Sequence, residues 1–319
     1  IYFGTPGEEL DSEDYEPAPP NLRDLVAWQD GQMAALSGAG MRFCERGAVS
    51  NWSSAYELAF FSYPLRLVAG RHTAYVLTRG QPAIIKLQHG CDQPFCHAAE
   101  HIQRSLPIIA TDSAVVIDER VYYASSEGLV RIGPDGSVAI VSDPYFGPIE
   151  WDSILPSTMR AGRWRSHYVF VTDAGAWMLD TQADPRTALM SVDLDARSFS
   201  AGELGDLHFI NDTGVYQWAA GEHDMPWRWS SPVVMLPHWT ALWGYRVLAT
   251  WPGVRARVLT GDHTILVGDA DIVADEEIID GGVRVLPAGH SCMALAVELE
   301  GTGEVSAVLV GPHSEDLTV

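Results

Sequence analysis

A glycine-centred turn recurs five times along this chain at nearly regular intervals. The turn glycines lie 49, 48, 47 and 39 residues apart; they are Gly31, Gly80, Gly128, Gly175 and Gly214. Four of them follow an apolar, aromatic-rich stretch, and each precedes another short apolar stretch. Glycine adopts positive φ at no steric cost, so this pattern predicts a β-hairpin. A period of about forty to fifty residues is typical of one four-stranded β-propeller blade, which cannot bury its apolar face alone.

The pattern of short apolar stretches predicts an all-β chain in three parts. Residues 1–20 combine carboxylates with prolines, which favours an extended arm or linker. Residues 21–240 carry the propeller-like repeats. Residues 241–319 contain short strands at tighter spacing with glycine turns, which is typical of a small β-sandwich. Within the repeats, one short helix is expected from Cys96 to Ser105.

The charge of the chain limits its partners. It carries 42 Asp and Glu against 20 Lys and Arg, a formal net charge of −22. This argues against a surface that grips nucleic acid, because such a surface needs a basic patch. An acidic wall past which DNA slides remains compatible, and so does acidity that serves solubility alone. The four cysteines are too few for a disulfide scaffold and suit synthesis in a reducing compartment.

One segment contains residue types that bind metals. Cys91, Cys96, His97 and His101 lie within eleven residues, and the two histidines would share a face of the expected helix. The spacing matches no familiar zinc pattern, so a loop with buried thiols and exposed histidines is the favoured interpretation. No cofactor is expected, because the sequence contains no phosphate-binding loop or dinucleotide fingerprint.

Acidic residues recur just before three of the repeat glycines. Glu127, Asp173 and Asp212 would lie at one end of a propeller, where they could surround a channel mouth or, as a pair, act as glycosidase carboxylates. The favoured interpretation is simpler, because acidic residues are good turn formers. No catalytic residue is predicted. The stretch Trp227-Arg228-Trp229 could bind a sugar or a base, but packing at a domain junction is favoured.

The order of several motifs resembles the tail nozzle, or tail tubular protein B, family of short-tailed bacteriophages. The resemblance runs from about residue 21 to the end. It is carried by segments 67–82, 121–132, 151–159, 168–180, 227–237 and 283–289, and by the ending VELEGTGEVSAVLVGPHSEDL. Examples are VYYASSEGLVRI at 121–132 and WDSILPSTM at 151–159. The segment from Cys91 to Leu106 departs from the family and resembles an insertion.

The resemblance implies a structural protein of the virion tail, made in the host cytoplasm, rather than an enzyme. It implies a homo-hexameric ring around the DNA exit channel, contacts with an adaptor ring and tail fibres, and passage of DNA without specific binding. Contact with the host envelope is a further expectation, and a sixfold ring requires heterologous interfaces. Two alternatives remain open at this point. One is a glycan-binding or glycan-cleaving β-propeller, and the other is an interaction scaffold of the kelch type.

Overall fold

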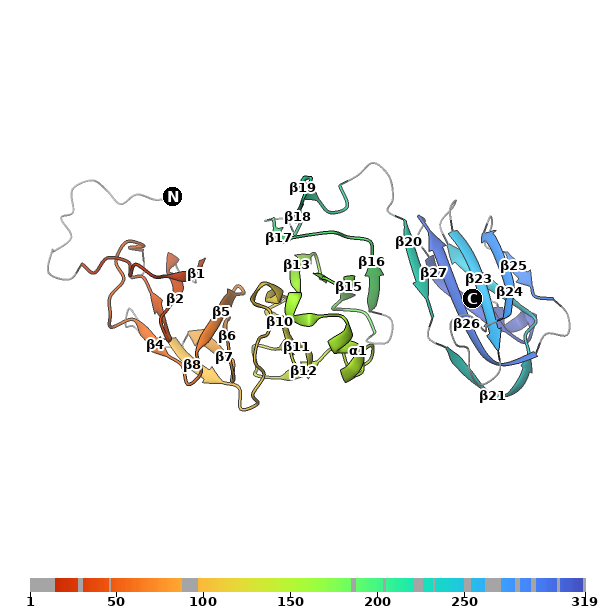
Figure 1. Ribbon diagram of the computed structural model, residues 1–319, viewed down its shortest axis with the longest axis horizontal. Coiled ribbons are helices and arrows are strands. Elements are labelled where there is room, and N and C mark those ends of the chain that lie inside the picture. The colour runs from red at the N-terminus through yellow and green to blue at the C-terminus, as the bar shows by residue number, and fades with distance from the viewer. Residues whose placement is uncertain are drawn as a thin grey trace. The chain divides into compact units, whose positions relative to one another are not determined.

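The chain folds into two compact units, which are best described separately (Figure 1). The first extends to Trp218 and the second begins at Ala219, except that Met190–Asp193 groups with the second. The computed structural model describes residues 15–27, 31–45, 47–87, 97–184, 188–202, 205–220, 226–231, 233–249, 254–261, 271–278, 282–287, 291–302 and 305–317. Most of the expected arm, residues 1–14, lies outside these ranges.

The first unit is a series of antiparallel sheets, each formed by strands that follow one another along the chain. Four sheets have four strands and the fifth has three among the described residues. The sheets are β1(Arg23–Ala27), β2(Met33–Ser37), β3(Gly40–Phe43) and β4(Glu57–Ala59); β5(Pro64–Ala69), β6(Ala74–Thr78), β7(Ala83–Leu87) and β8(His97–His101); β9(Val115–Ile117), β10(Arg120–Ser125), β11(Gly128–Ile132) and β12(Val138–Ile140); β13(Arg160–Trp164), β14(His167–Thr172), β15(Gly175–Asp180) and β16(Leu189–Val192); and β17(Ser198–Ala201), β18(Leu207–Asn211) and β19(Gly214–Gln217).

These sheets pack face to face as propeller blades do. The first strand of each sheet contacts the first strand of the next, from β1 through β5, β9 and β13 to β17. The apolar cores lie between neighbouring sheets: Tyr75 and Ile84 of the second sheet share one cluster with Tyr123 and Val130 of the third. The third and fourth sheets share another, which includes Tyr168. The propeller-like architecture predicted from the glycine period is therefore confirmed.

Side-chain hydrogen bonds also join neighbouring sheets. The Tyr168 hydroxyl, on the fourth sheet, donates to the carbonyl oxygen of Ser113 beside the third, 2.7 Å away. The Tyr75 hydroxyl of the second sheet donates to the carbonyl oxygen of Glu119, in the β9–β10 turn. The Glu119 carboxylate in turn accepts the backbone N–H of His72 at 2.9 Å. Because buried polar groups need partners, these bonds help to fix how one sheet sits on the next.

Four of the five repeat glycines lie at the turn between the second and third strands of a sheet. Gly80 lies within the β6–β7 turn, whereas Gly128, Gly175 and Gly214 each begin a third strand. Gly31 also lies in a hairpin, between the antiparallel strands β1 and β2, but this is the first turn of its sheet and not the second. An isolated glycine before an apolar stretch marks a turn, but it does not say which turn of the blade.

Glycine is sterically required at Gly128. Its φ is +139°, and a Cβ there would lie 2.4 Å from Ile140 Cγ2 and 2.5 Å from Ser142 Oγ. Both atoms belong to the segment that covers the start of β11, so a side chain would displace that segment. The repeat therefore keeps glycine here for space as well as for backbone conformation.

The helix expected from Cys96 to Ser105 is wrong. Residues His97–His101 form β8, whose backbone pairs with β7 from Ala83↔His101 to Leu87↔His97. The sheet edge offered by β7 overrides a weak local helical preference. A helix occurs elsewhere: α1(Pro148–Ser153) begins with Pro148, and the Glu150 carboxylate accepts the Gly147 N–H at 2.7 Å. The 3-10 turn η3(Pro156–Thr158) follows it.

The second unit is the predicted β-sandwich of two antiparallel sheets. One contains β20(Trp227–Ser230), β21(Val234–Ala241), β23(Val254–Gly261), β24(Asp271–Ile278) and β26(Ser291–Gly301), and the other contains β22(Gly244–Ala249), β25(Val283–Val285) and β27(Val305–Gly311). Tyr245, Val258 and Val297 lie in the shared apolar core. The sequence also predicts a strand at Thr264–Val267, which lies outside the described residues.

The sandwich begins earlier than the expected boundary between residues 240 and 241. β20 pairs with β26 from Trp227↔Gly301 to Ser230↔Glu298, and β21 continues along the same strand. β20 and nearly all of β21 fall within the stretch assigned to the repeats from sequence. The error has a physical cause: these strands pair with residues about fifty to seventy-five positions later, and an apolar strand does not reveal its distant partner in its own sequence.

Candidate functional site

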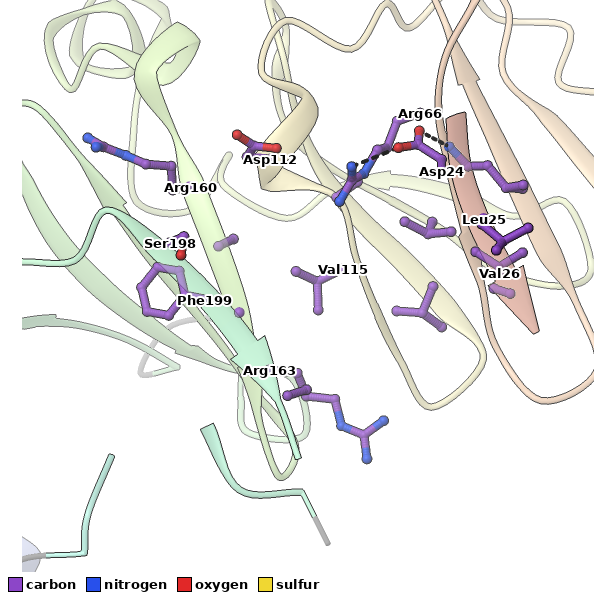
Figure 2. Close-up of a pocket in the computed structure, with 18 of the residues that line it drawn as sticks. Asp24, Leu25, Val26, Arg66, Asp112, Val115, Arg160, Arg163, Ser198 and Phe199 are labelled. Carbon is purple, nitrogen blue, oxygen red and sulfur yellow. Dashed lines mark hydrogen bonds and ion pairs between the residues drawn. The ribbon is translucent and has the colours of Figure 1, made fainter. Parts of the chain in front are cut away.

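The clearest concave site is a pocket of about 590 Å³ in the first unit. Its lining comes from the first strands of all five sheets or from the residues just before them (Figure 2). These strands are the ones that contact each other in sequence order, so the pocket occupies the centre of the propeller-like repeat. The volume is within the range of sites that bind small molecules. We refer to it as the central pocket.

The central pocket carries more cations than anions, in a chain that is strongly acidic. Four arginines line it together with two carboxylates; these residues are Arg66, Arg160, Arg163, Arg197, Asp24 and Asp112. The Asp24 carboxylate forms one ion pair and one hydrogen bond. Its Oδ1 lies 3.0 Å from Arg66 Nη1, and its Oδ2 accepts the Leu67 N–H at 3.0 Å. Asp24 has a φ of 52°, in the left-handed region, which aspartate tolerates better than most residues.

The three predicted turn carboxylates occupy equivalent positions. Glu127, Asp173 and Asp212 lie in the turns between second and third strands of consecutive sheets. Each forms an ion pair with an arginine: Glu127 with Arg104, Asp173 with Arg160 at 2.8 Å, and Asp212 with Arg197. Pairing of this kind suits turn residues that neutralise nearby guanidinium groups. Their role at a channel mouth stays a prediction.

Three of the pocket arginines have a buried donor without an acceptor. The Nε atoms of Arg66, Arg160 and Arg163 are out of contact with solvent and have no hydrogen-bond partner among the described residues. Arg66 and Arg160 use a terminal nitrogen for their ion pairs, whereas no ion pair with a described residue is found for Arg163. The three guanidinium groups therefore carry N–H donors that the described residues do not satisfy.

The structure describes only two of the four candidate metal ligands. Cys91 and Cys96 lie outside the described residues, so their geometry stays untested. His97 is buried, stacked on Phe43 with ring centroids 4.3 Å apart, and its Nε2 lies 2.9 Å from Gln32 Oε1. Burial lowers the pKa of His101, which lies against Phe61. No group of three or more metal-binding side chains occurs within the described ranges.

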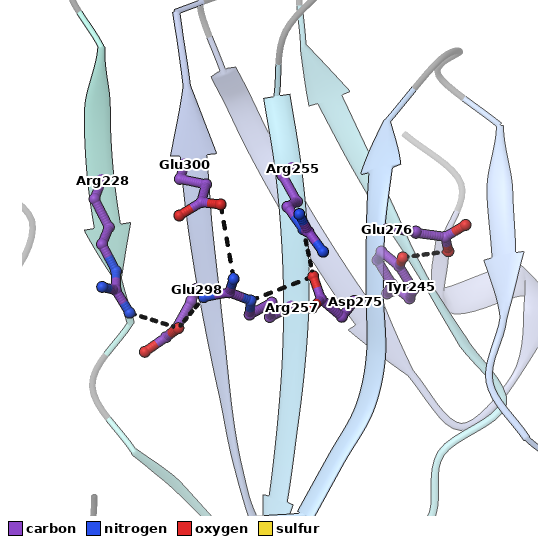
Figure 3. Close-up of polar contacts among 8 residues, drawn as sticks. All are labelled: Arg228, Tyr245, Arg255, Arg257, Asp275, Glu276, Glu298 and Glu300. Carbon is purple, nitrogen blue, oxygen red and sulfur yellow. Dashed lines mark hydrogen bonds and ion pairs between the residues drawn. The ribbon is translucent and has the colours of Figure 1, made fainter.

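The Trp227-Arg228-Trp229 segment packs within the second unit. Trp227 and Trp229 both pack against the sandwich core. Arg228, which lies between them in the strand, points outward and pairs with Glu298 at 2.9 Å. Figure 3 shows that this pair belongs to a ladder of charges across four strands, which continues through Arg257 to Asp275. The indoles therefore serve the core, and the sugar- or base-binding interpretation finds no support in their placement.

Burial raises the pKa of several phenols above the ordinary tyrosine value. In each case removal from water disfavours the charged form more than any neighbouring charge does. In Tyr245, the hydrogen bond to the Glu276 carboxylate adds to the effect. These four buried tyrosines are Tyr75, Tyr123, Tyr168 and Tyr245.

Sequence reasoning did not find the central pocket. Its arginines are separated by up to about 130 positions and belong to different sheets, so no local motif contains them. A signal was nevertheless present, because Arg66, Arg160 and Arg197 recur near the beginning of a first strand. Aligning the repeats by their first strands, instead of by their turn glycines, would have brought these residues together.

Comparison with known proteins gives no family for this chain. No family model matches it, and no curated protein does. Solved structures do match: virginiamycin B lyase from Staphylococcus aureus has 10% identity and a TM-score of 0.38, covering 62% of this chain and 69% of that one. BBS1N in complex with ARL6DN has 14% identity and a TM-score of 0.41, covering 63% and 65%. Similarity at this level says nothing of substrate, partner or activity.

None of the helices in the described part of the chain has the length and apolar character to cross a bilayer.

Proposed function

We propose that this protein is a structural component of a bacteriophage tail, a nozzle or tail-tube subunit that assembles with copies of itself into a ring. In this proposal it acts in the virion tail, in tail assembly and genome ejection, and is not an enzyme. A homo-hexamer would surround the DNA exit channel and contact an adaptor ring and tail fibres, with host-envelope contact at its distal side. DNA would pass along the acidic lumen without specific binding.

The observation that carries the proposal is an exposed apolar strip on the second unit. Large apolar side chains are exposed along the edge strand β21 and its flanks; they are Val233, Val234, Met235, Trp239 and Trp243. Trp239 alone is 61% exposed. Exposed apolar residues concentrated in one place mark a surface that another molecule covers, and an edge strand also offers unpaired backbone groups. A subunit of an assembly has such surfaces, and a catalytic monomer does not need them.

The segments that carry the family resemblance also support a structural role. Segment 121–132 forms the β10–β11 hairpin, and segment 168–180 forms most of the β14–β15 hairpin. In segment 151–159, the buried Trp151 donates its Nε1–H to the Ser125 carbonyl oxygen at 2.9 Å. These segments hold the sheets together, so the resemblance concerns architecture rather than a reactive site.

The alternative of a glycan-cleaving propeller is less well supported. A glycosidase needs two carboxylates placed to act on one bond. The turn carboxylates are each paired with a separate arginine, which would have to release them before they could act. Binding of a glycan without cleavage makes no such demand, and it would be detected by a glycan array.

The test is the assembly state of the purified chain and its presence in tail particles. We expect electron microscopy to show rings with a central channel wide enough for duplex DNA. Trp239→Asp should shift the protein from ring to monomer in light scattering coupled to gel filtration, because a charge would be buried at the interface. Ile149→Asp is the matched control, since Ile149 is 86% exposed on α1 of the first unit. A monomeric wild-type protein that is absent from particles would refute the proposal.

A further inference from the structure

We propose that the central pocket binds a small amphipathic oxyanion, whose carboxylate or phosphate head pairs with Arg163 and whose apolar body fills the pocket. This inference concerns the interior of one first unit, so it does not depend on ring assembly or on a role in a phage tail.

Among the described residues, Arg163 is the pocket arginine for which no carboxylate partner is found. Arg66 is paired with Asp24, Arg160 with Asp173, and Arg197 with Asp212. The remaining lining carboxylate is Asp112, which Figure 2 places at the opposite end of the pocket from Arg163. Asp112 therefore does not neutralise Arg163, and a bound anion would.

The free donors of Arg163 suit an oxyanion. Its side chain is partly buried, and its Nε is shielded from solvent without an acceptor among the described residues. A carboxylate or phosphate has two oxygens at the spacing of two guanidinium N–H groups, so it can accept from the two terminal nitrogens together. Such a ligand would supply an acceptor for these groups.

The wall beside Arg163 is apolar. Leu25, Val115 and Phe199 are labelled in Figure 2 along the pocket between its two charged ends. Leu25 is 54% exposed although it lines a concave surface, so part of its side chain is left for a ligand to cover. A free inorganic anion would leave these apolar side chains exposed to water. An aromatic or aliphatic body attached to the anionic head would cover it, and that is why the ligand is amphipathic.

The test is calorimetric titration of the full chain with benzoate, phenyl phosphate and benzyl alcohol. The first two share an aromatic body and differ in the oxyanion, whereas benzyl alcohol keeps the body without the charge. We expect saturable binding of at least one anion, and binding of benzyl alcohol at least about tenfold weaker. The tighter of the two anions identifies the head group. No saturable binding of either anion would overturn the proposal.

Variants of Arg163 place the binding at this pocket. Arg163→Gln removes the charge and should weaken binding of the anion at least about tenfold. Arg163→Lys keeps the charge but loses the paired guanidinium N–H donors, so it should give an intermediate loss of affinity for the anion. The matched control is Arg165→Gln, because Arg165 is exposed beside Trp164 and does not line the pocket. Equal weakening by Arg163→Gln and Arg165→Gln would overturn the proposal. If the glutamine variant fails to fold by circular dichroism, the lysine variant decides in the same way.

Discussion

The hydrogen bond from Tyr168 to Ser113 gives a direct test of how the third and fourth sheets pack. Tyr168→Phe removes one hydroxyl and keeps the ring, so the apolar contacts remain. The hydroxyl donates at 2.7 Å to the Ser113 carbonyl oxygen, and both residues are fully buried. The variant leaves that carbonyl without its donor, so we expect a loss of about 1–3 kcal/mol in the free energy of unfolding.

Urea unfolding followed by tryptophan fluorescence measures this loss, read on the transition of the first unit. Tyr216→Phe is the control, because the Tyr216 hydroxyl is shared with the exposed Thr213 hydroxyl at 2.9 Å. Loss of a surface hydroxyl should change stability by less than about 0.5 kcal/mol. If the two variants were equally stable, a water molecule would be satisfying the Ser113 carbonyl, and the direct bond between the sheets would not be a determinant of stability.

Three further predictions follow from the packing. Gly162→Ala should destabilise the first unit by about 1–3 kcal/mol, because a Cβ there would lie 2.5 Å from Leu207 Cδ1 and 2.7 Å from Phe199 Cβ; urea unfolding measures this, and an unchanged midpoint would contradict it. The four buried tyrosines have raised pKa values. Their contribution to the free energy of unfolding is therefore complete below the unfolded tyrosine pKa of about 10 and is lost as pH rises above it. Stability measured between about pH 9 and 12 should therefore fall by up to about 1.4 kcal/mol per pH unit for each tyrosine, and a flat profile would contradict this. Burial raises the pKa of the Cys44 and Cys292 thiols, so peptide mapping after iodoacetamide treatment should find both unlabelled until the protein is unfolded; labelling under native conditions would contradict their burial.

Local signals in the sequence are enough to predict the strand-rich repeat and the position of most of its hairpins. Apolar alternation and turn glycines are local signals, and a hairpin is a local structure whose two strands lie next to each other in the chain. The β10–β11 and β14–β15 hairpins were found for this reason. The sandwich core strands β22 and β26 were found because their apolar runs are continuous and closely spaced.

Packing between distant parts of the chain sets which strands share a sheet across long separations and which side chains meet in the central pocket. The pairing of β20 with β26 joins residues about seventy positions apart, and its stability comes from burial against the sandwich core rather than from the sequence of β20. His97 shows the same limit, because the free edge of β7 turned an expected helix into a strand. Arg66, Arg163 and Arg197 converge because the first strands of successive sheets pack side by side, and no local pattern in the sequence encodes that convergence.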